Sequence, residues 1–278
     1  MTLTNSTAAP QPSSPLQGHQ RPRVLSLPPF SSSLGEEALE LCGTFGLALD
    51  PWQAFVLDRS LRLNEYGKWA AFEIGVDVAR QNGKGTILEG RELVGLFLIR
   101  ERLIIHSAHQ FDTSLEAFRR LLTLIESNPD AERRVKRVSR SHGEEGIELK
   151  GGQRIRFRTR TKGGGRGFSC DCLMLDEPMI LPEATHGALL PTLSARPNPQ
   201  VWYTGSAVDQ TIHEDGRVFA RVRERGLKGD DPSLAYFEWS VDSSNPDDVP
   251  AAILASPDAI AQANPGLGIR ITLEYVAN

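Results

Sequence analysis

The stretch "WAAFEIGVDVARQNGKGT", residues 69–86, decides the fold of this 278-residue chain. Its first part, residues 69–78, is rich in aromatic and β-branched side chains and predicts a buried strand. The second part is similar to the phosphate-binding pattern G-x-x-x-x-G-K-[ST], with Gly83 and Lys84 in the expected places. The next segment, residues 86–99, has the length and composition of a helix. A strand, a loop and a helix in this order form the setting in which backbone N–H groups and a lysine hold a phosphate.

Two positions depart from this pattern. Val78 stands where the first glycine is expected, and Gly85 stands where a Ser or Thr hydroxyl would hold Mg²⁺. Thr86 comes one residue late. Because a helix turns by about 100° per residue, Thr86 can serve as the metal ligand only if the loop shifts. Otherwise water fills that coordination position, which Mg²⁺ accepts because it commonly keeps several waters. The sequence leaves both options open.

A second motif, "CLMLDE" at residues 172–177, is an apolar strand that ends in two carboxylates. In the Walker B pattern the first acid, here Asp176, organises Mg²⁺, and the second, Glu177, polarises the attacking water. The plainer interpretation is a strand that runs into a turn ended by Pro178. Two motifs in the right order and setting favour an ATPase in which Lys84 and Glu177 are catalytic.

Segments typical of strands alternate with segments typical of helices. Residues 102–108 and 200–207 predict short strands, and residues 113–127 predict a helix with one apolar face. This alternation predicts an α/β protein around a mostly parallel sheet. Ligands of such sheets bind at the carboxyl ends of the strands. Three polar strand ends are therefore expected to meet in one crevice, at residues 80–84, 176–177 and 204–206.

Capping signals place helix starts and a domain boundary. Residues 33–36, 50–53 and 113–116 each have the spacing of a capping box, which predicts a helix start at each. Residues 1–34 contain six prolines and seven serines without periodicity, which predicts a disordered tail. The folded domain is therefore expected to span residues 35–278.

Composition restricts the class of protein. The chain is 40% hydrophobic and 24% charged, as in ordinary globular domains. No apolar run approaches the ~20 residues of a membrane-spanning helix, so we expect no membrane partner. Three cysteines are too few for a disulfide framework, which favours a reducing compartment and a cytoplasmic location.

Basic residues are concentrated in residues 131–166, which hold twelve Lys/Arg and four acids and so carry a local charge of +8. Within this stretch, residues 147–160 predict a hairpin in which Ile155 and Phe157 face one way. The arginines that face the other way are Arg154, Arg156 and Arg158. They are candidates for contact with a polyanion such as DNA. A charged, solvated strand edge explains the pattern equally well.

These motifs give the chain a resemblance to the ATPase domain of the large terminase subunit, the DNA-packaging motor of tailed bacteriophages. That family uses a deviant phosphate loop without the first glycine, typically R-Q-x-G-K-[ST]. The matching residues here are Arg80, Gln81, Asn82, Gly83 and Lys84, followed by Gly85 and Thr86. The missing first glycine is therefore a family habit, whereas Gly85 departs from the family pattern as well.

The resemblance extends to further residues, each with a plainer interpretation. Gln53 is similar to the family's adenine-reading glutamine, although it also fits a capping box. Arg166 lies eleven residues before Glu177, where some members carry an arginine finger. The family's coupling motif is matched by Thr204, Gly205 and Ser206, which could also simply satisfy a turn. His106 and His109 lack further ligands at metal spacing, and we interpret them as polar residues at the rim of the site.

The resemblance implies a P-loop NTPase fold of the additional-strand, catalytic-glutamate type. It also implies ATP and Mg²⁺ as cofactors, double-stranded DNA as substrate, and a homo-oligomeric ring on the procapsid that is monomeric when isolated. Its partners would be the portal protein and a small terminase subunit in the host cell cytoplasm. The family's C-terminal nuclease domain is expected to be absent from this chain, through truncation or a split protein, so no nuclease activity is expected. The alternatives are a helicase-like ATPase and a non-catalytic nucleic-acid-binding module with a decayed nucleotide site.

Overall fold

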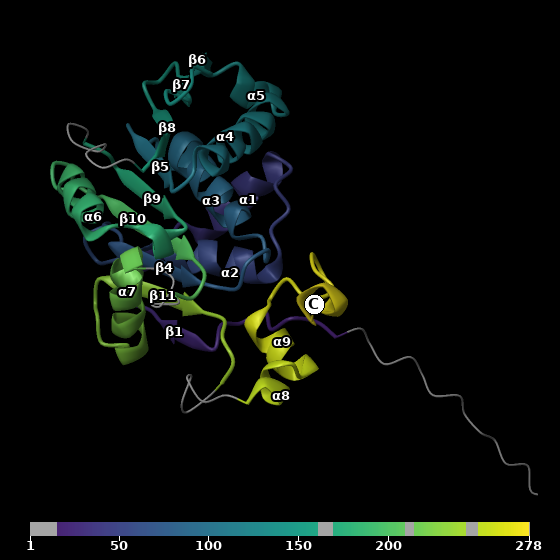
Figure 1. Ribbon diagram of the computed structural model, residues 1–278. Helices are drawn as coiled ribbons and strands as arrows, with labels where there is room; N and C mark the ends of the chain where they lie inside the picture. The colour runs from purple at the N-terminus through teal and green to yellow at the C-terminus, as the bar shows by residue number, and fades with distance from the viewer. Residues whose placement is uncertain (1–15, 161–168, 209–213, 243–249, 278) are drawn as a thin grey trace, which may run out of the picture.

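A computed structural model describes residues 16–160, 169–208, 214–242 and 250–277. In this part of the chain the dominant feature is a nine-stranded sheet with the order β1-β11-β4-β10-β9-β5-β8-β7-β6 (Figure 1). Its strands are β1 (Val24–Ser26), β4 (Glu73–Asp77), β5 (Ile104–Ala108), β6 (Val135–Ser139), β7 (Gly146–Leu149), β8 (Arg154–Thr159), β9 (Cys172–Asp176), β10 (Gln200–Gly205) and β11 (Leu234–Glu238). A separate two-stranded ribbon pairs β2 (Ser32–Ser33) with β3 (Arg62–Leu63).

The centre of the sheet is parallel and its edges are antiparallel. Strands β11, β4, β10, β9, β5 and β8 run in one direction, whereas β1 and the β7–β6 ribbon run against their neighbours. Strand β10 lies between β4 and β9, so one strand separates the phosphate-loop strand from the strand that ends in two acids. This inserted strand defines the additional-strand type of P-loop fold, and the predicted α/β fold class is confirmed.

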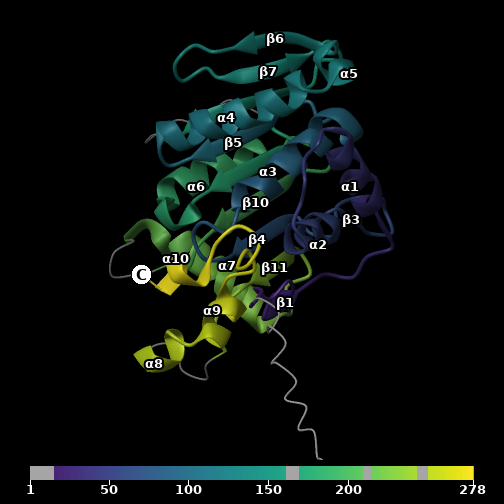
Figure 2. The ribbon, with the colours of Figure 1, turned by 90° about the vertical axis from the view of Figure 1, so that its right-hand side faces the viewer.

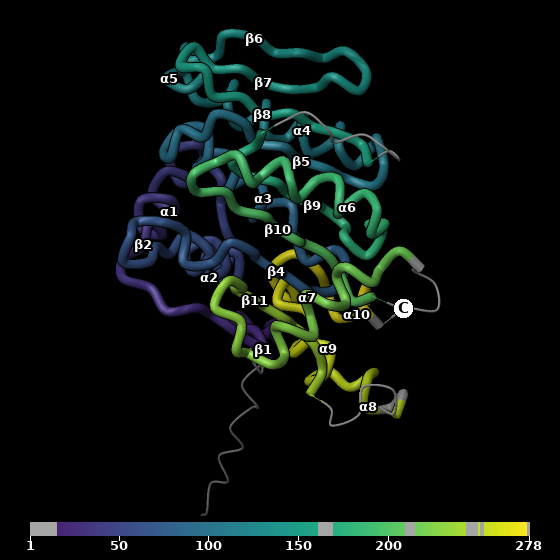
Figure 3. Tube along the Cα trace, turned by 90° about the vertical axis from the view of Figure 1, so that its left-hand side faces the viewer, coloured from purple at the N-terminus to yellow at the C-terminus, as the bar shows by residue number. Residues whose placement is uncertain are grey.

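Helices cover both faces of the sheet. One face carries α1 (Gly35–Thr44), α2 (Pro51–Ser60), α3 (Lys84–Leu93) and α4 (Phe111–Glu126), with the short α5 (Pro129–Glu132) beside α4 (Figure 2). The other carries α6 (Glu183–Leu189) and α7 (Arg217–Lys228) (Figure 3). Helix α3 continues into a π-helical segment over Val94–Ile99. The last described residues form α8 (Ala251–Leu254), α9 (Pro257–Ala263) and α10 (Leu273–Ala277).

Alternating strand residues supply two cores, one on each face. Ile74, Val76 and Met174 belong to the cluster under α1–α4. Leu175 and Tyr203 belong to the cluster under α6 and α7. A sheet buried on both faces requires nearly continuous apolar strands, which explains why residues 172–175 show no polar alternation.

All three predicted helices are present, but two of the three predicted capping boxes are wrong. Helix α1 begins at Gly35, and the Ser33 hydroxyl accepts a hydrogen bond from the Gly35 N–H instead of capping with Glu36. Helix α4 begins at Phe111, two residues before Thr113, and the Phe111 ring packs 4.0 Å from the ring of His142. Tertiary packing has outweighed the local capping signal there. The capping box at residues 50–53 is confirmed, with Asp50 as N-cap of α2.

The predicted disordered tail is wrong from residue 16 onward; residues 1–15 lie outside the described part. β1 pairs with β11, so residues 24–26 close one edge of the sheet. Upstream of β1, Gly18 N–H donates to the Leu267 carbonyl and His19 N–H to the Ala261 carbonyl. This segment is structured through hydrogen bonds to residues more than 200 positions away. The composition of the segment itself gives no indication of these partners.

None of the described helices is long and apolar enough to cross a membrane. The three cysteine thiols are buried and free.

Candidate active site

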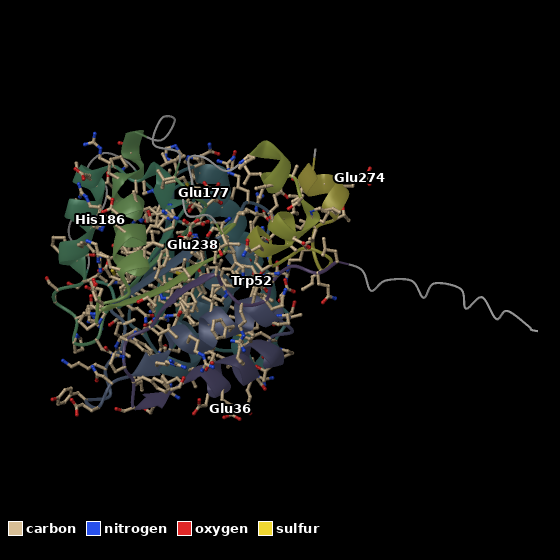
Figure 4. The ribbon with its side chains drawn as sticks, turned by 90° about the horizontal axis from the view of Figure 1, so that it is seen from below. Glu36, Trp52, Glu177, His186, Glu238 and Glu274 are labelled. Carbon is tan, nitrogen blue, oxygen red and sulfur yellow. The ribbon has the colours of Figure 1, made fainter. Side chains whose placement is uncertain are left out.

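The carboxyl ends of the parallel strands meet at one edge of the sheet, as the sequence predicts. Gly205 at the end of β10 is in register with Asp77 at the end of β4. Its neighbour Thr204 is in register with Asp176 at the end of β9. Figure 4 shows Glu177, directly after β9, and Glu238, the last residue of β11, near the middle of the molecule.

A cavity of about 440 Å³ opens at this edge. Its cationic residues are Arg80, Lys84 and Arg120, and its acidic residues are Glu89, Glu92, Glu116, Asp176 and Glu177. Gln81, Gly83, Gly85, His106 and Ser206 also line it. One cavity therefore brings together residues from all three predicted strand ends.

The phosphate loop is held in a left-handed shape. Gln81 and Gly83 have φ angles of 65° and 90°, in the region that glycine favours. The fully buried Asn82 donates from Nδ2 to the Ala79 carbonyl at 3.1 Å and to the Arg80 carbonyl at 3.2 Å. These bonds turn the chain so that α3 begins at Lys84 with its first N–H groups at the cavity.

The C-terminal segment also holds the loop. Asn82 Nδ2 donates to Asn264 Oδ1 at 3.0 Å, and its Oδ1 accepts from the Gly266 N–H at 2.8 Å. Arg270 binds the carboxylate of Asp50 and, at 3.2 Å, Gln53 Oε1. Residues 264–270 therefore pack directly against the loop.

Lys84 is folded back onto its own loop. Its ammonium donates to the Val78 and Ala79 carbonyls, each at 3.1 Å, and to Ser206 Oγ at 3.0 Å. Burial lowers the pKa of Lys84 to about 8. Nearby carboxylates act in the opposite direction and raise the pKa, and Asp176 has the largest effect among them. The ammonium therefore links the loop to the end of β10, close to Asp176.

Glu177 has a strained backbone. Its φ of 53° and ψ of 58° place it in the left-handed region, which costs a non-glycine residue about 1–3 kcal/mol. The Glu177 N–H donates to the Thr204 carbonyl at 3.1 Å, and Pro178 begins a 3₁₀ turn, Pro178–Ile180. Strain of this kind persists only where the surroundings enforce it, and it is common at active sites.

Arg160, just after β8, helps to enforce this conformation. Its Nη2 donates to the Asp176 carbonyl at 2.6 Å and to the Glu177 carbonyl at 2.9 Å, while Nη1 donates to the Ser107 carbonyl at 2.7 Å. Burial lowers the pKa of this guanidinium to about 10. One half-buried cation thus joins the ends of β8, β5 and β9. Sequence analysis did not single out Arg160, because it is only one of twelve basic residues in its stretch.

A buried acid–imidazole–acid chain lies behind Asp176. His106 Nδ1 lies 2.6 Å from Glu92 Oε1, and its Nε2 lies 3.9 Å from Asp176 Oδ2. Burial lowers the pKa of His106, but the carboxylates of Glu92 and Asp176 more than offset it and bring the value to about 9. The imidazole is only 2% exposed, so the expectation that His106 is a rim residue is wrong. Its partner Glu92 is fourteen positions away on α3, which no local pattern indicates.

Several buried polar atoms at this edge have no hydrogen-bond partner among the residues that the structure describes. They are Glu92 Oε2, His106 Nε2, Arg160 Nε and Thr204 Oγ1. Buried polar groups are normally satisfied, so such a cluster marks a place where a further polar group belongs. Among the described residues, no group of three or more His, Cys, Asp or Glu side chains could hold a metal ion by itself. A single carboxylate such as Asp176 is sufficient for Mg²⁺, because this ion is usually bound through one or two carboxylates together with waters and substrate phosphates.

Five predicted site residues at this edge are not in the lining of the cavity: Gln53, Asn82, Thr86, Thr204 and Gly205. Gln53 is fully buried, with Oε1 accepting from the Asp50 N–H and Nε2 donating to the Gly83 carbonyl, both at 2.8 Å. Thr86 lines an adjoining open cavity of about 450 Å³, together with Leu47 and Arg270. In this structure Gln53 therefore supports the loop, and Thr86 lines a different cavity from Asp176.

The remaining predicted residues are remote from the cavity or undescribed. Arg166 lies outside the described residues. In β8 the expected alternation is present, with Ile155 and Phe157 buried and Arg154 exposed. The half-buried Arg156 and Arg158 lie 3.8 and 3.3 Å from carboxylate oxygens of Glu144, so this face is partly neutralised.

Comparison with known proteins identifies the fold. No protein-family model matches the sequence, and no curated protein matches it. Among solved structures, the HK97 bacteriophage large terminase matches with a TM-score of 0.70 and 16% identity, over 88% of this chain and 50% of that one. The Thermus phage P74-26 large terminase ATPase domain matches at a TM-score of 0.49 and 18% identity, over 66% of this chain and 72% of that one. The large terminase of a thermophilic bacteriophage, in complex with ATP-γ-S, matches at a TM-score of 0.48 and 14% identity, over 67% of this chain and 44% of that one.

The HK97 match carries the conclusion. This chain spans about half the length of that terminase, and at 16% identity the likeness concerns the fold. The chain has the fold of the matching half of a phage large terminase, as the resemblance of its motifs predicted.

Proposed function

We propose that this chain is an ATP-hydrolysing motor domain that drives double-stranded viral DNA into a procapsid. The observation that carries the proposal is the convergence of Lys84, Asp176 and Glu177 on one cavity at the carboxyl edge of a P-loop sheet. The fold shared with the HK97 large terminase supports the packaging role.

Each residue has a role that its position suggests. Lys84 leaves the carbonyls of its loop for the phosphates, and the first N–H groups of α3 bind phosphate oxygens. Asp176 holds Mg²⁺, which supplies charge neutralisation at the transferring phosphoryl group. Glu177, one residue further along, orients the attacking water and accepts its proton. Arg80 is exposed at the cavity mouth and is suited to contact a phosphate.

The coupling role proposed for residues 204–206 is supported by three contacts. Ser206 accepts from Lys84, and the Thr204 carbonyl accepts from the Glu177 N–H. A Cβ on Gly205 would lie 2.8 Å from Pro178 Cδ, so only glycine allows this close approach. The end of β10 therefore contacts both Lys84 and the backbone of Glu177, the proposed catalytic acid. A displacement of either residue would be transmitted to the end of β10.

The wider assembly is inferred from the terminase resemblance. We propose that the chain works as a homo-oligomeric ring on the portal protein in the host cell cytoplasm, with a small terminase subunit that selects the DNA. In such a ring Arg166 reaches the nucleotide of a neighbouring subunit. The arginines of β8 are proposed to contact the DNA backbone.

Glu177→Gln tests the proposal, with Glu183→Gln as the matched control, because Glu183 is an exposed glutamate at the start of α6. Phosphate release from ATP, with and without duplex DNA, is measured for both variants and for wild type. We expect Glu177→Gln to bind ATP and release almost no phosphate, and Glu183→Gln to match wild type. Absence of phosphate release by wild type under assembling conditions would favour the non-catalytic module. Unwinding of a labelled duplex would favour the helicase-like ATPase.

A further inference from the structure

Gly85 in the phosphate loop lies next to the guanidinium of an arginine from another helix. Gly85 is the first-turn residue of α3 that replaces the usual Ser or Thr. A Cβ added there would lie 3.4 Å from Arg120 Nη1 and 3.8 Å from Glu89 Oε1. Arg120 comes from α4, thirty-five positions later in the chain. The space into which a metal-ligating hydroxyl would extend therefore faces an arginine.

Acidic neighbours hold this arginine at the cavity. Nη1 of Arg120 lies 3.3 Å from Glu89 Oε1, and Nε lies 3.5 Å from Glu116 Oε1. Among the described residues, the contacts of Arg120 with acids involve Nη1 and Nε. The Arg120 side chain is 49% exposed, so it is accessible to a ligand in the cavity. An arginine has five N–H donors in a fixed fork, so this one can bind a further anion without leaving Glu89.

The cavity needs such a cation. Its lining contains Arg80, Lys84, Arg120 and the imidazole of His106 against five acidic side chains, and a triphosphate adds further negative charge. Lys84 must exchange its bonds to the loop and to Ser206 before it reaches a phosphate, and Arg80 is exposed at the mouth. Arg120 also lines the adjoining cavity in which Thr86 lies, so it stands at the junction of the two.

We propose that Arg120 is a phosphate-binding residue of the nucleotide site, and that its guanidinium lies on the side of the loop toward which a hydroxyl at position 85 would extend. This inference rests on the proposed nucleotide function of the same cavity. The planar fork pairs with two phosphate oxygens, a geometry that a hydroxyl does not offer. The plainer alternative is that Arg120 forms an ordinary surface ion pair with Glu116, which contributes little to stability and nothing to binding.

The two interpretations of Arg120, phosphate binding and an ordinary surface ion pair, predict different affinities for nucleotide in the absence of metal. Affinity for ATP, ADP and adenosine is measured in excess chelator and again with Mg²⁺, for wild type, Arg120→Gln and Arg140→Gln. Arg140 is a matched control because it is an exposed arginine paired with another acid of α4, Glu126, at 3.2 Å and lines neither cavity. We expect Arg120→Gln to weaken metal-free binding of ATP and ADP by roughly 10- to 100-fold and to leave adenosine unchanged, because charged hydrogen bonds to phosphate are lost. Arg140→Gln should match wild type.

A second variant tests the link between Gly85 and Arg120. Gly85→Ser introduces a hydroxyl beside the guanidinium and should also weaken metal-free binding, while increasing the factor by which Mg²⁺ improves affinity. The double variant Gly85→Ser with Arg120→Gln should bind no more weakly than Arg120→Gln alone, because both changes act on one contact.

The outcomes separate this inference from the proposed function. If wild type binds no ATP while folded, the nucleotide function itself fails. If wild type binds ATP and Lys84→Ala does not, but Arg120→Gln behaves like Arg140→Gln, the role of Arg120 is refuted and the nucleotide site stands. Additive losses in the double variant would refute the link between Gly85 and Arg120.

Discussion

Removing the guanidinium of Arg160 should damage both stability and catalysis, because it joins three strand ends behind the proposed catalytic acid. Arg160→Met keeps most of the side-chain volume and deletes the three bonds to the carbonyls of Ser107, Asp176 and Glu177. Charge-assisted bonds contribute about 1.5–3 kcal/mol each, or roughly 6 kcal/mol for three. Burial lowers the pKa of Arg160 well below its ordinary value, to about 10. This desolvation offsets about 3 kcal/mol, at 1.36 kcal/mol per unit.

The expected net loss for Arg160→Met is therefore about 3 kcal/mol of unfolding free energy. Urea unfolding followed by circular dichroism measures it. Arg154→Gln is the control, since Arg154 is exposed on the same strand and should change stability by less than about 0.5 kcal/mol. Turnover should fall by about 100-fold in the folded Arg160→Met variant, with ATP affinity near wild type, because Glu177 loses part of its backbone restraint.

Arg160→Lys adds a second test of geometry. A single ammonium keeps the charge but cannot bond all three carbonyls, so stability and turnover should both be intermediate. If Arg160→Met unfolds like wild type and hydrolyses ATP at the wild-type rate, the bonds of Arg160 do not position the acid, and the reasoning fails.

Four further predictions concern other parts of the molecule. Lys84→Ala should abolish ATP binding and hydrolysis with an unchanged circular dichroism spectrum; wild-type hydrolysis would reject the phosphate-loop assignment. Burial, and next the charge of a neighbouring glutamate, raise the pKa of Asp77 from 3.8 to about 7, so the folded protein loses stability as pH rises between these two values. Asp77→Asn should therefore gain about 2–3 kcal/mol relative to wild type between about pH 5 and 8, measured by unfolding at each pH, and a constant difference would refute this role of Asp77. If β8 binds DNA, Arg154→Gln should lower the slope of log affinity against log salt by ~0.9, whereas an unchanged slope indicates a solvated edge. Arg166→Ala mixed with Glu177→Gln should regain part of the ATPase activity that each lacks, and no rescue under assembling conditions would exclude a role for Arg166 in trans.

The fold, and the convergence of Lys84, Asp176 and Glu177 on one cavity, could be predicted because their signals are local. Residues 69–86 and 172–177 each contain a strand, its terminating polar residues and the start of the next element, so sequence periodicity and residue type suffice. Sheet order is less directly accessible, since the position of β10 between β4 and β9 came from a family resemblance.

The supporting residues could not be predicted, because their partners are distant in sequence. Arg160 bonds carbonyls 16, 17 and 53 positions away, and Asn82 bonds residues more than 180 positions away. Nor does local sequence show that His106 is buried against Glu92, because Glu92 lies fourteen positions away on α3. Such contacts are determined by tertiary packing, and no window of ten or twenty residues contains them.

The contacts of Asn82 with residues 264 and 266 have a consequence for how the protein is made. Helix-local contacts form early in folding, whereas contacts between distant residues must first close a long loop of chain. During synthesis the phosphate loop emerges about 180 residues before the segment that completes its hydrogen bonds. Until then the amide of Asn82 has only its own loop as a partner. We therefore expect a nascent chain to complete the hydrogen bonds of this loop only after residues 264–266 have left the ribosome, so the loop reaches its final shape later than the strands beside it.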